Sequence, residues 1–264
     1  MKNFKPFAVK KKQGSVSYDS DAQAFITAAS ITDSTQKSAI NQLVLDLKSN
    51  NLWAKMKAVY PMVGGNSSAH KFNLKDPRDL DAAFRLSFAG TWTHSSTGAY
   101  SSGAGSYANT FLVPSSVLAG VADQHLSYYS RTSNSGDTDI GSGTYNGGGI
   151  LMWVRYSADN KTYTSLANQT FSTPTSGLGL HIVTANSSTT QIVTPTSSAS
   201  AGIASGSLSA RNVYIGGSDN DNTLYYPTPR ECAFASVGNG LSGSDCTNLQ
   251  TIVNNYQQTL GRKV

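Results

Sequence analysis

The chain has 264 residues, which is enough for one large all-β domain, alone or with a small helical unit. Only 13% of the residues are charged, whereas 38% are hydrophobic and 24 are glycines, a composition that predicts short strands joined by turns and excludes intrinsic disorder. Residues 1–14 contain five lysines and no acid, and the other 15 basic residues equal the 15 acidic ones, so the neutral body argues against a nucleic-acid-binding protein.

Residues 1–18 are predicted to form a basic, extended N-terminal arm. No apolar segment or small-residue cleavage site follows the lysines, so we expect no signal peptide. The longest apolar run, residues 150–154, is too short to insert into a membrane. The arm is either a solvated tail or, as we favour, an assembly arm that contacts neighbouring proteins. Its candidate contact residues are Lys2, Phe4, Lys5, Phe7, Lys10, Lys11 and Lys12.

Residues 19–62 are predicted to be a helical segment. Asp19 and Asp21 offer capping side chains for a first helix. A second helix has an apolar stripe at i, i+3, i+4 and i+7, which either packs on the same chain, as we favour, or serves oligomerisation. A third, short helix is expected over residues 52–60 and would end at Pro61. The stripe consists of Ile40, Leu43, Val44 and Leu47.

Residues 63–264 are predicted to be an antiparallel β-sandwich, because short alternating runs are separated by turn residues with no helical pattern between them. A Ser- and Ala-rich stretch, 194–210, is expected to be a surface loop. The expected strands are 84–88, 109–113, 124–129, 151–156, 178–183 and 212–215, and the main turn clusters are 133–143, 156–161 and 219–222.

The last element is predicted to be a helix at residues 242–260. Ser242 can cap it, and Asp245 lies three residues later, near the positive end of the helix. Its apolar residues share one face, which we expect to be buried within the same chain. They are Leu249, Ile252, Val253, Tyr256 and Leu260.

The order of these parts carries a resemblance. Residues 211–217 (Arg-Asn-Val-Tyr-Ile-Gly-Gly), residues 232–242 and the helix that ends in Leu260-Gly261-Arg262 resemble the closing half of concanavalin A-like (laminin-G-like) jelly rolls. Upstream segments, among them 72–84 and 125–132, resemble such modules in virion proteins of tailed bacteriophages. The resemblance covers about residues 19–264. It implies location in a virion assembled in the host cytoplasm, with other virion proteins and copies of this chain as partners.

Catalytic patterns are missing from the sequence. Laminarinase-type enzymes on this fold pair carboxylates on one strand, whereas this chain has a single glutamate, Glu231. The densest aspartates, Asp76, Asp79 and Asp81, lie in a turn-like stretch with compensating basic residues. We therefore predict no catalytic residues and no enzymatic activity, with a glycoside hydrolase as the second alternative.

Two candidate binding sites remain. Trp92, Tyr225 and Tyr226 are candidates for stacking on a host-surface glycan, whereas Trp153 is expected to lie in the core. Asp219 and Asp221 offer oxygen ligands for Ca²⁺, although such residues more often form plain polar turns, and no other cofactor is expected.

Three classes of function remain open. The favoured one is a non-catalytic structural or decoration protein of a bacteriophage virion; the first alternative is a lectin-like, receptor-binding module, and the second is a hydrolase. Cys232 and Cys246 are expected to be buried thiols, with a single disulfide as the alternative.

Overall fold

The computed structural model describes residues 17–143, 149–166 and 169–264. Residues 1–16, which contain every predicted contact residue of the arm, lie outside this part of the chain. The helices of the described residues are α1 (Ser20–Ala28), α2 (Ser34–Ser49), α3 (Ser67–His70), α4 (Pro114–Val117) and α5 (Gly243–Thr259), with 3₁₀ turns η1 (Trp53–Lys55) and η2 (Asp81–Ala83).

The described strands form two sheets in which every pairing is antiparallel except that of β15 with β7. The first sheet has the order β13 (Ser198–Ala201), β12 (Thr190–Val193), β11 (Gly179–Ala185), β6 (Gln124–Ser130), β17 (Glu231–Gly238), β4 (Gly98–Ser101) and β3 (Trp92–Ser95), and β1 (Met56–Tyr60) also pairs with β17. The second has the order β10 (Gln169–Pro174), β9 (Lys161–Leu166), β8 (Ile150–Trp153), β7 (Ile140–Ser142), β14 (Tyr214–Ile215), β5 (Tyr107–Asn109) and β2 (Ser87–Ala89), with β15 (Ser218–Asn220) beside β7 and β16 (Thr223–Tyr225) beside β15.

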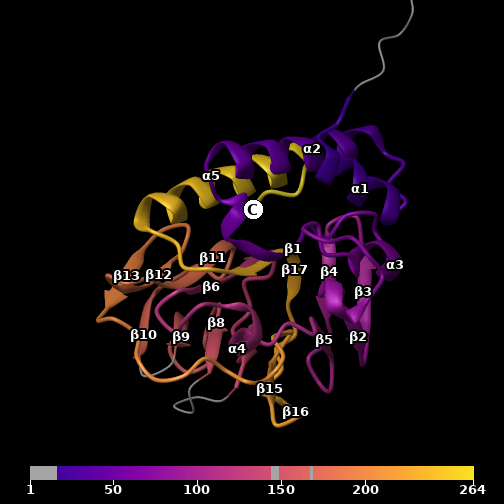
Figure 1. Ribbon diagram of the computed structural model, residues 1–264. Helices are drawn as coiled ribbons and strands as arrows, with labels where there is room; N and C mark the ends of the chain where they lie inside the picture. The colour runs from indigo at the N-terminus through magenta and orange to yellow at the C-terminus, as the bar shows by residue number, and fades with distance from the viewer. Residues whose placement is uncertain (1–16, 144–148, 167–168) are drawn as a thin grey trace, which may run out of the picture.

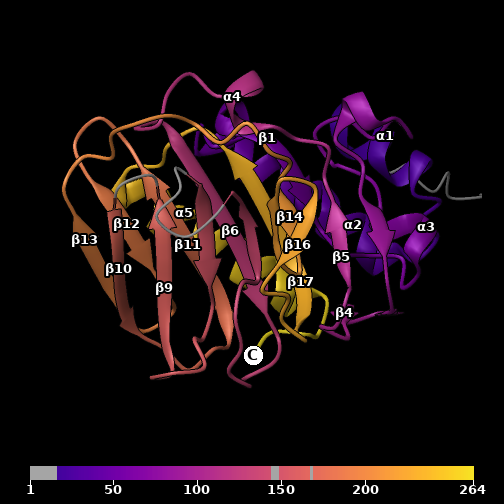
Figure 2. The same cartoon turned by 90° about the horizontal axis from the view of Figure 1, so that it is seen from below.

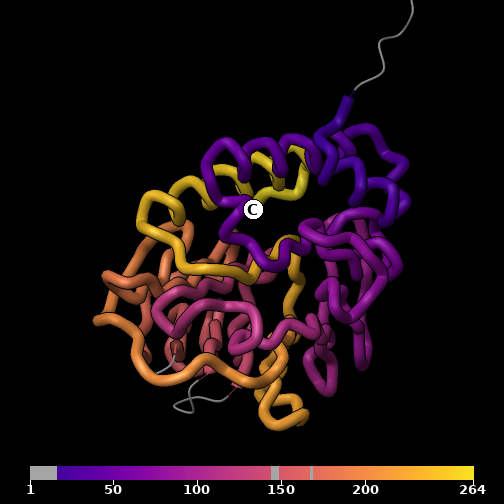
Figure 3. Tube along the Cα trace, in the orientation of Figure 1, coloured from indigo at the N-terminus to yellow at the C-terminus, as the bar shows by residue number. Residues whose placement is uncertain are grey.

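The molecule has three layers, which are helices, first sheet and second sheet (Figure 1). One apolar core lies between the two sheets and contains residues such as Leu126, Met152 and Ile215. Another lies between the first sheet and the helices, where Leu180 and Ile182 of β11 meet α2 and α5. The tube view shows helix α2 beside the yellow C-terminal helix α5 (Figure 3). The predicted β-sandwich with an N-terminal helical segment and a C-terminal helix is therefore confirmed.

The first two helices form as their sequences predict. The side chain of Asp19 accepts a hydrogen bond from the backbone N–H of Asp21, and that of Asp33 accepts one from Gln36, so each helix begins at an aspartate cap. The four residues of the predicted stripe on α2 are all buried in the core that α2 shares with α5. The stripe thus packs on its own chain.

The predicted third helix is wrong. After the short turn η1, residues 56–60 form strand β1, which pairs with β17 inside the first sheet. Met56 and Val59 face the helices, whereas Ala58 and Tyr60 face the core between the sheets. A strand buried on both faces is apolar throughout, and in a short segment this pattern cannot be distinguished from a buried helix.

Two stretches predicted as turns or loops contain strands. Residues 198–201 of the expected surface loop form edge strand β13, which pairs with β12, and residues 140–142 of a predicted turn cluster form β7. Ser-, Ala- and Gly-rich strands have weak strand propensity of their own, so pairing with their neighbours decides their structure.

Two expected strands have other bounds in the structure, because a residue in each has a left-handed backbone. Residues 84–88 become a strand only from Ser87, because Phe84 has a left-handed backbone with φ of 59°. Phe111 is also left-handed, so β5 ends at Asn109 and the expected strand at 109–113 does not form. The strands expected at 124–129 and 178–183 are confirmed as β6 and β11.

The closing helix α5 has the predicted start. Ser242 and Asp245 form a reciprocal capping box, in which each side chain accepts a hydrogen bond from the backbone N–H of the other residue. Leu249, Val253 and Tyr256 are buried against α2 and the outer face of the first sheet. The helix therefore packs within its own chain, on the outside of the sandwich.

The two cysteines are free and buried. Cys232 lies in the core between the sheets, whereas Cys246 lies in the core under the helices, so the alternative of a disulfide is wrong. Among the residues described here, no helix has the length and apolarity needed to cross a membrane.

Candidate functional site

A cleft of about 510 Å³ opens beside strands β8 and β9 of the second sheet, the sheet whose other face covers the core. It draws its lining from separate parts of the chain: β8 and β9, the turn between them, the loop before β7 and the end of hairpin β15–β16. Figure 2 shows β9 and β16 from the side of this sheet. The lining residues are Asp137, Trp153, Tyr156, Tyr163, Tyr225 and Tyr226.

Strand alternation places the first two rings. Trp153 of β8 lies directly opposite Tyr163 of β9, so their side chains share one face of the sheet. Met152 and Val154, which flank Trp153, face the core between the sheets. Trp153 is buried as expected, with 6% of its surface exposed, but on the face away from the core between the sheets, where its ring forms a wall of the cleft.

The other rings continue the wall. The ring centroids of Trp153 and Tyr156 are 6.3 Å apart, and those of Tyr156 and Tyr163 are 5.3 Å apart, both in edge-to-face geometry. The Tyr163 hydroxyl donates a hydrogen bond to the Asp159 carboxylate at 2.8 Å. These contacts fix the orientation of the rings without occupying the cleft.

Hairpin β15–β16 carries the predicted residues Tyr225 and Tyr226 to the same cleft. Their ring centroids are 3.9 Å apart. Tyr226 is 52% exposed and has a left-handed backbone with φ of 46°, a conformation that a bulky residue rarely adopts. Its carbonyl accepts a hydrogen bond from the backbone N–H of Thr138 at 2.9 Å, so a neighbouring loop holds this conformation in place.

Asp137 supplies the carboxylate of the cleft. Partial burial raises its pKa, and a hydrogen bond from Ser157 opposes this shift. The preceding residue, Gly136, donates its backbone N–H to the carbonyl of Arg155 at 2.8 Å, and a Cβ atom there would lie 2.4 Å from the Thr228 side chain. The loop of Asp137 is thus packed closely against the segment that follows β8 and against the segment that follows β16.

A buried ion pair between Arg230 and Asp139 stabilises the loop of Asp137. The Arg230 Nε atom lies 2.6 Å from Asp139 Oδ1, and both side chains are buried. The other Asp139 oxygen accepts a hydrogen bond from the backbone N–H of Val154, next to Trp153. The guanidinium also donates to the carbonyls of Thr132 and Asn134. Sequence analysis missed this pair because residues 91 positions apart carry no local pattern.

The third predicted stacking residue, Trp92, lies elsewhere. It belongs to β3 in the first sheet, where its Nε1–H donates to the carbonyl of Ala89 at 3.0 Å and its ring packs edge-on against Phe88. The structure therefore brings Tyr225 and Tyr226 together with Trp153 and leaves Trp92 outside the cleft.

The predicted calcium ligands have partners within the protein. The buried Asp219 carboxylate accepts hydrogen bonds from the backbone N–H groups of Asn222 and Asn212, at 2.8 and 3.2 Å. Asp221 is exposed and forms an ion pair with Arg211. In the described ranges no three or more His, Cys, Asp or Glu side chains gather where they could hold a metal ion. Asp219 closes the turn of hairpin β15–β16.

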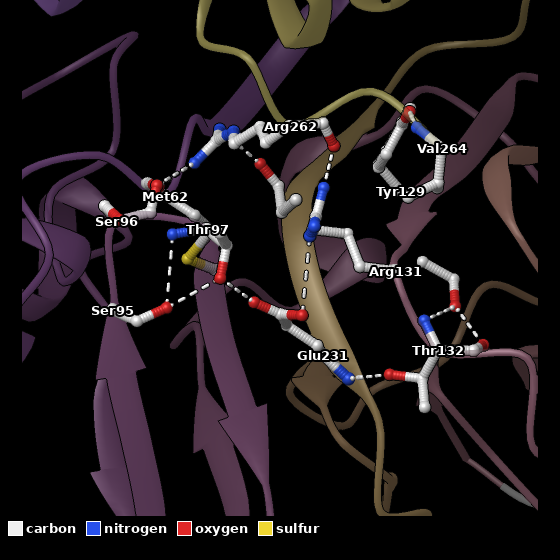
Figure 4. Close-up of polar contacts among 12 residues, drawn as sticks. Met62, Ser95, Ser96, Thr97, Tyr129, Arg131, Thr132, Glu231, Arg262 and Val264 are labelled. Carbon is white, nitrogen blue, oxygen red and sulfur yellow. Dashed lines mark hydrogen bonds and ion pairs between the residues drawn. The ribbon is translucent and has the colours of Figure 1, made fainter.

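The single glutamate belongs to a separate polar cluster (Figure 4). The Glu231 carboxylate accepts a hydrogen bond from the Thr97 hydroxyl and lies 3.4 Å from Arg131 Nε. Arg131 also donates to the carbonyl of Arg262, whose own buried guanidinium donates to Met62 and other backbone carbonyls. This cluster connects the C-terminal residues to the first sheet.

The aspartates considered for catalysis are also paired with basic side chains. Asp76 binds Arg78, and Asp79 binds both Lys71 and Arg85, which also contacts Asp81. The compensating charges expected from the sequence are therefore present in the structure.

No protein-family model and no curated protein matches the sequence. Among solved structures, a mutant of Trypanosoma rangeli sialidase displaying trans-sialidase activity has a TM-score of 0.46 at 11% identity, over 84% of this chain and 39% of its own. Domain 4 of AbnA, a GH43 extracellular arabinanase from Geobacillus stearothermophilus, in complex with arabinotriose, has a TM-score of 0.45 at 10% identity, over 74% and 98%.

The intramolecular trans-sialidase of the leech has a TM-score of 0.38 at 15% identity, over 50% of this chain and 23% of the enzyme. This chain thus spans less than half the length of either sialidase. At these scores and identities, none of the likenesses assigns a function or a residue role to this chain. The resemblance to concanavalin A-like jelly rolls is confirmed at the level of a two-sheet antiparallel sandwich, and the link to bacteriophage virions stays a prediction.

Proposed function

We propose that this protein is a carbohydrate-binding module and that the aromatic cleft is its binding site. The observation that carries the proposal is the convergence of five aromatic rings and one carboxylate on one hollow. Aromatic faces pack well on the apolar C–H surfaces of sugars, and a carboxylate accepts hydrogen bonds from sugar hydroxyls. The cleft volume of about 510 Å³ is typical of small-ligand sites.

Some rings of the cleft are held in fixed orientations, and one is exposed where a ligand can reach it. Trp153, Tyr156 and Tyr163 are fixed by the sheet and by one another, and Tyr226 exposes half of its surface at the mouth. Rigid aromatic side chains lose little conformational entropy on binding, which favours a stacked ligand. We therefore assign stacking to Tyr226, with the buried Trp153 as the wall behind it, and hydrogen bonding to Asp137 and the tyrosine hydroxyls.

We propose binding without cleavage. A glycoside hydrolase of the usual kind places two carboxylates on either side of the scissile bond. The described lining of the cleft contains one carboxylate, Asp137. Glu231 supports the same proposal, because its carboxylate is engaged by Thr97 and Arg131 in another part of the fold.

The role in a virion stays a prediction from the sequence resemblance. It comprises a structural or decoration function, virion proteins as partners and the arm as the means of attachment. A glycan-binding cleft is compatible with such a setting, since a module on a particle surface can both assemble and attach to a host.

The direct test compares two exposed tyrosines. Tyr226→Ala removes the ring at the mouth of the cleft, whereas Tyr100→Ala removes a tyrosine of the first sheet that is 39% exposed and lies outside the cleft. We expect Tyr226→Ala to weaken binding to the best ligand of a glycan array at least tenfold, and Tyr100→Ala to leave it unchanged. Isothermal titration measures both.

Two outcomes would overturn the proposal. One is the absence of any glycan that binds the wild-type chain in millimolar titrations. The other is equal affinity of wild type and Tyr226→Ala for the glycan that does bind, which would place the site elsewhere.

A further inference from the structure

The charge of the cleft restricts its ligand. Asp137 is the only charged residue among the six described residues that line it, and the other five are aromatic. We infer that the cleft binds neutral sugars and rejects anionic ones, such as sialic and uronic acids. This inference rests on the proposed function and names the ligand class of the same site.

The basic side chains of the neighbouring elements are directed to other partners. The Lys161 ammonium pairs with Asp159 at 3.1 Å, and the Arg155 guanidinium donates to the carbonyl of Ser133. Arg230 is buried in its ion pair with Asp139. An anionic sugar in the cleft would therefore meet the Asp137 carboxylate without a facing cation from these neighbouring elements, as far as the described residues show. Recognition of carboxylates in proteins ordinarily uses arginine or lysine.

Asp137 itself selects for hydroxyl donors. An ionised carboxylate only accepts hydrogen bonds, so it pairs with sugar hydroxyls and repels a second carboxylate in the same partly buried hollow. Burial raises the energetic penalty of such an unpaired charge, because less water screens it. The tyrosine hydroxyls of the lining can donate or accept and therefore impose no charge preference of their own.

The test uses matched ligands. Each neutral glycan of an array is printed beside the counterpart that differs only by one carboxylate, such as a glucoside beside the glucuronide with the same aglycone. The best neutral ligand and its counterpart are then titrated against the full chain. We expect the wild-type protein to bind the anionic counterpart at least tenfold more weakly.

Asp137→Asn separates charge from shape, because asparagine has nearly the same size and no charge. We expect this variant to weaken binding of the neutral ligand a fewfold and to bring the ratio of the two affinities close to one. Its melting temperature, compared with that of the wild type, shows whether it is folded.

The outcomes separate the inference from the proposed function. Equal or tighter binding of the anionic counterpart by the wild type, lost in Tyr226→Ala, would overturn the inference and keep the cleft as a glycan site. An unchanged ratio in folded Asp137→Asn would overturn Asp137 as the source of selectivity. Binding of neither ligand would overturn the proposed function.

Discussion

At the scale of single residues, the cleft depends on side chains that never meet the ligand. Asp139 and Arg230 are both buried, and their ion pair connects the loop of Asp137 to the end of β8. A buried charge that loses its partner is strongly destabilising, whereas removal of both charges is often tolerated. This asymmetry gives the pair a distinct thermodynamic signature.

We expect Asp139→Asn to lower the free energy of unfolding by about 3–5 kcal/mol, because Arg230 is left buried without a counter-charge. The double variant Asp139→Asn, Arg230→Gln should lose less than this. Chemical denaturation measures both. Asp159→Asn, which removes an exposed partner of Lys161, is the control and should change stability by about 0–1 kcal/mol. Equal losses for Asp139→Asn and this control would contradict the assigned role.

At the scale of elements, α5 behaves as part of the domain. Its capping box starts the helix, and its apolar face closes the core that it shares with α2 and the first sheet. In proteins most of the stability of a helix comes from such packing of its apolar face. The loss of one large buried side chain of α5 should therefore lower the free energy of unfolding of the whole domain.

Leu249→Ala in α5 should cost about 2–5 kcal/mol of stability in the isolated chain, since Leu249 is fully buried. Gln258→Ala, at an exposed position of the same helix, is the matched control and should be nearly neutral. Thermal and denaturant unfolding report the difference. An unchanged melting temperature for Leu249→Ala would mean that the helix does not stabilise the fold.

At the scale of the whole molecule, buried histidines make stability depend on pH. Burial lowers the pKa of His125 to about 4, and lowers those of His70 and His181 to about 3. Burial keeps His125 neutral, although one ring nitrogen lies 2.6 Å from the carbonyl oxygen of Asn239, a contact that opposes the shift, and the other lies 3.0 Å from the Ser236 hydroxyl. In the unfolded chain these side chains regain a pKa near 6.5, so the unfolded state binds more protons below that pH.

Stability should therefore be full above pH 6.5 and fall as the pH is lowered towards 4. His125 alone contributes a loss of about 3 kcal/mol over this window. The salt-bridged Asp19 and Asp79 lose their contribution only at lower pH, because ion pairing holds the pKa of each below the usual 3.8. Chemical denaturation at pH 7, 5.5 and 4.5 tests this. In His125→Gln the free energy of unfolding should fall less steeply with decreasing pH than in the wild type. A stability that is flat between pH 7 and 4.5 would contradict it.

Local sequence chemistry by itself determined much of this protein. The aspartate caps of α1 and α2, the stripe on α2, the capping box of α5 and the alternation in β6 and β11 all form as predicted, because each depends on neighbours a few residues away. The sequence also selected Tyr225 and Tyr226, since they follow a polar hairpin turn.

Only the tertiary structure decided the rest. Residues 56–60 became a strand because β17 pairs with them, and 198–201 because β12 does. The cleft brings Asp137, Trp153 and Tyr226 together from three separate elements, and the ion pair beneath it spans 91 positions of the chain. Such contacts are set by sheet order and register, which no local pattern encodes.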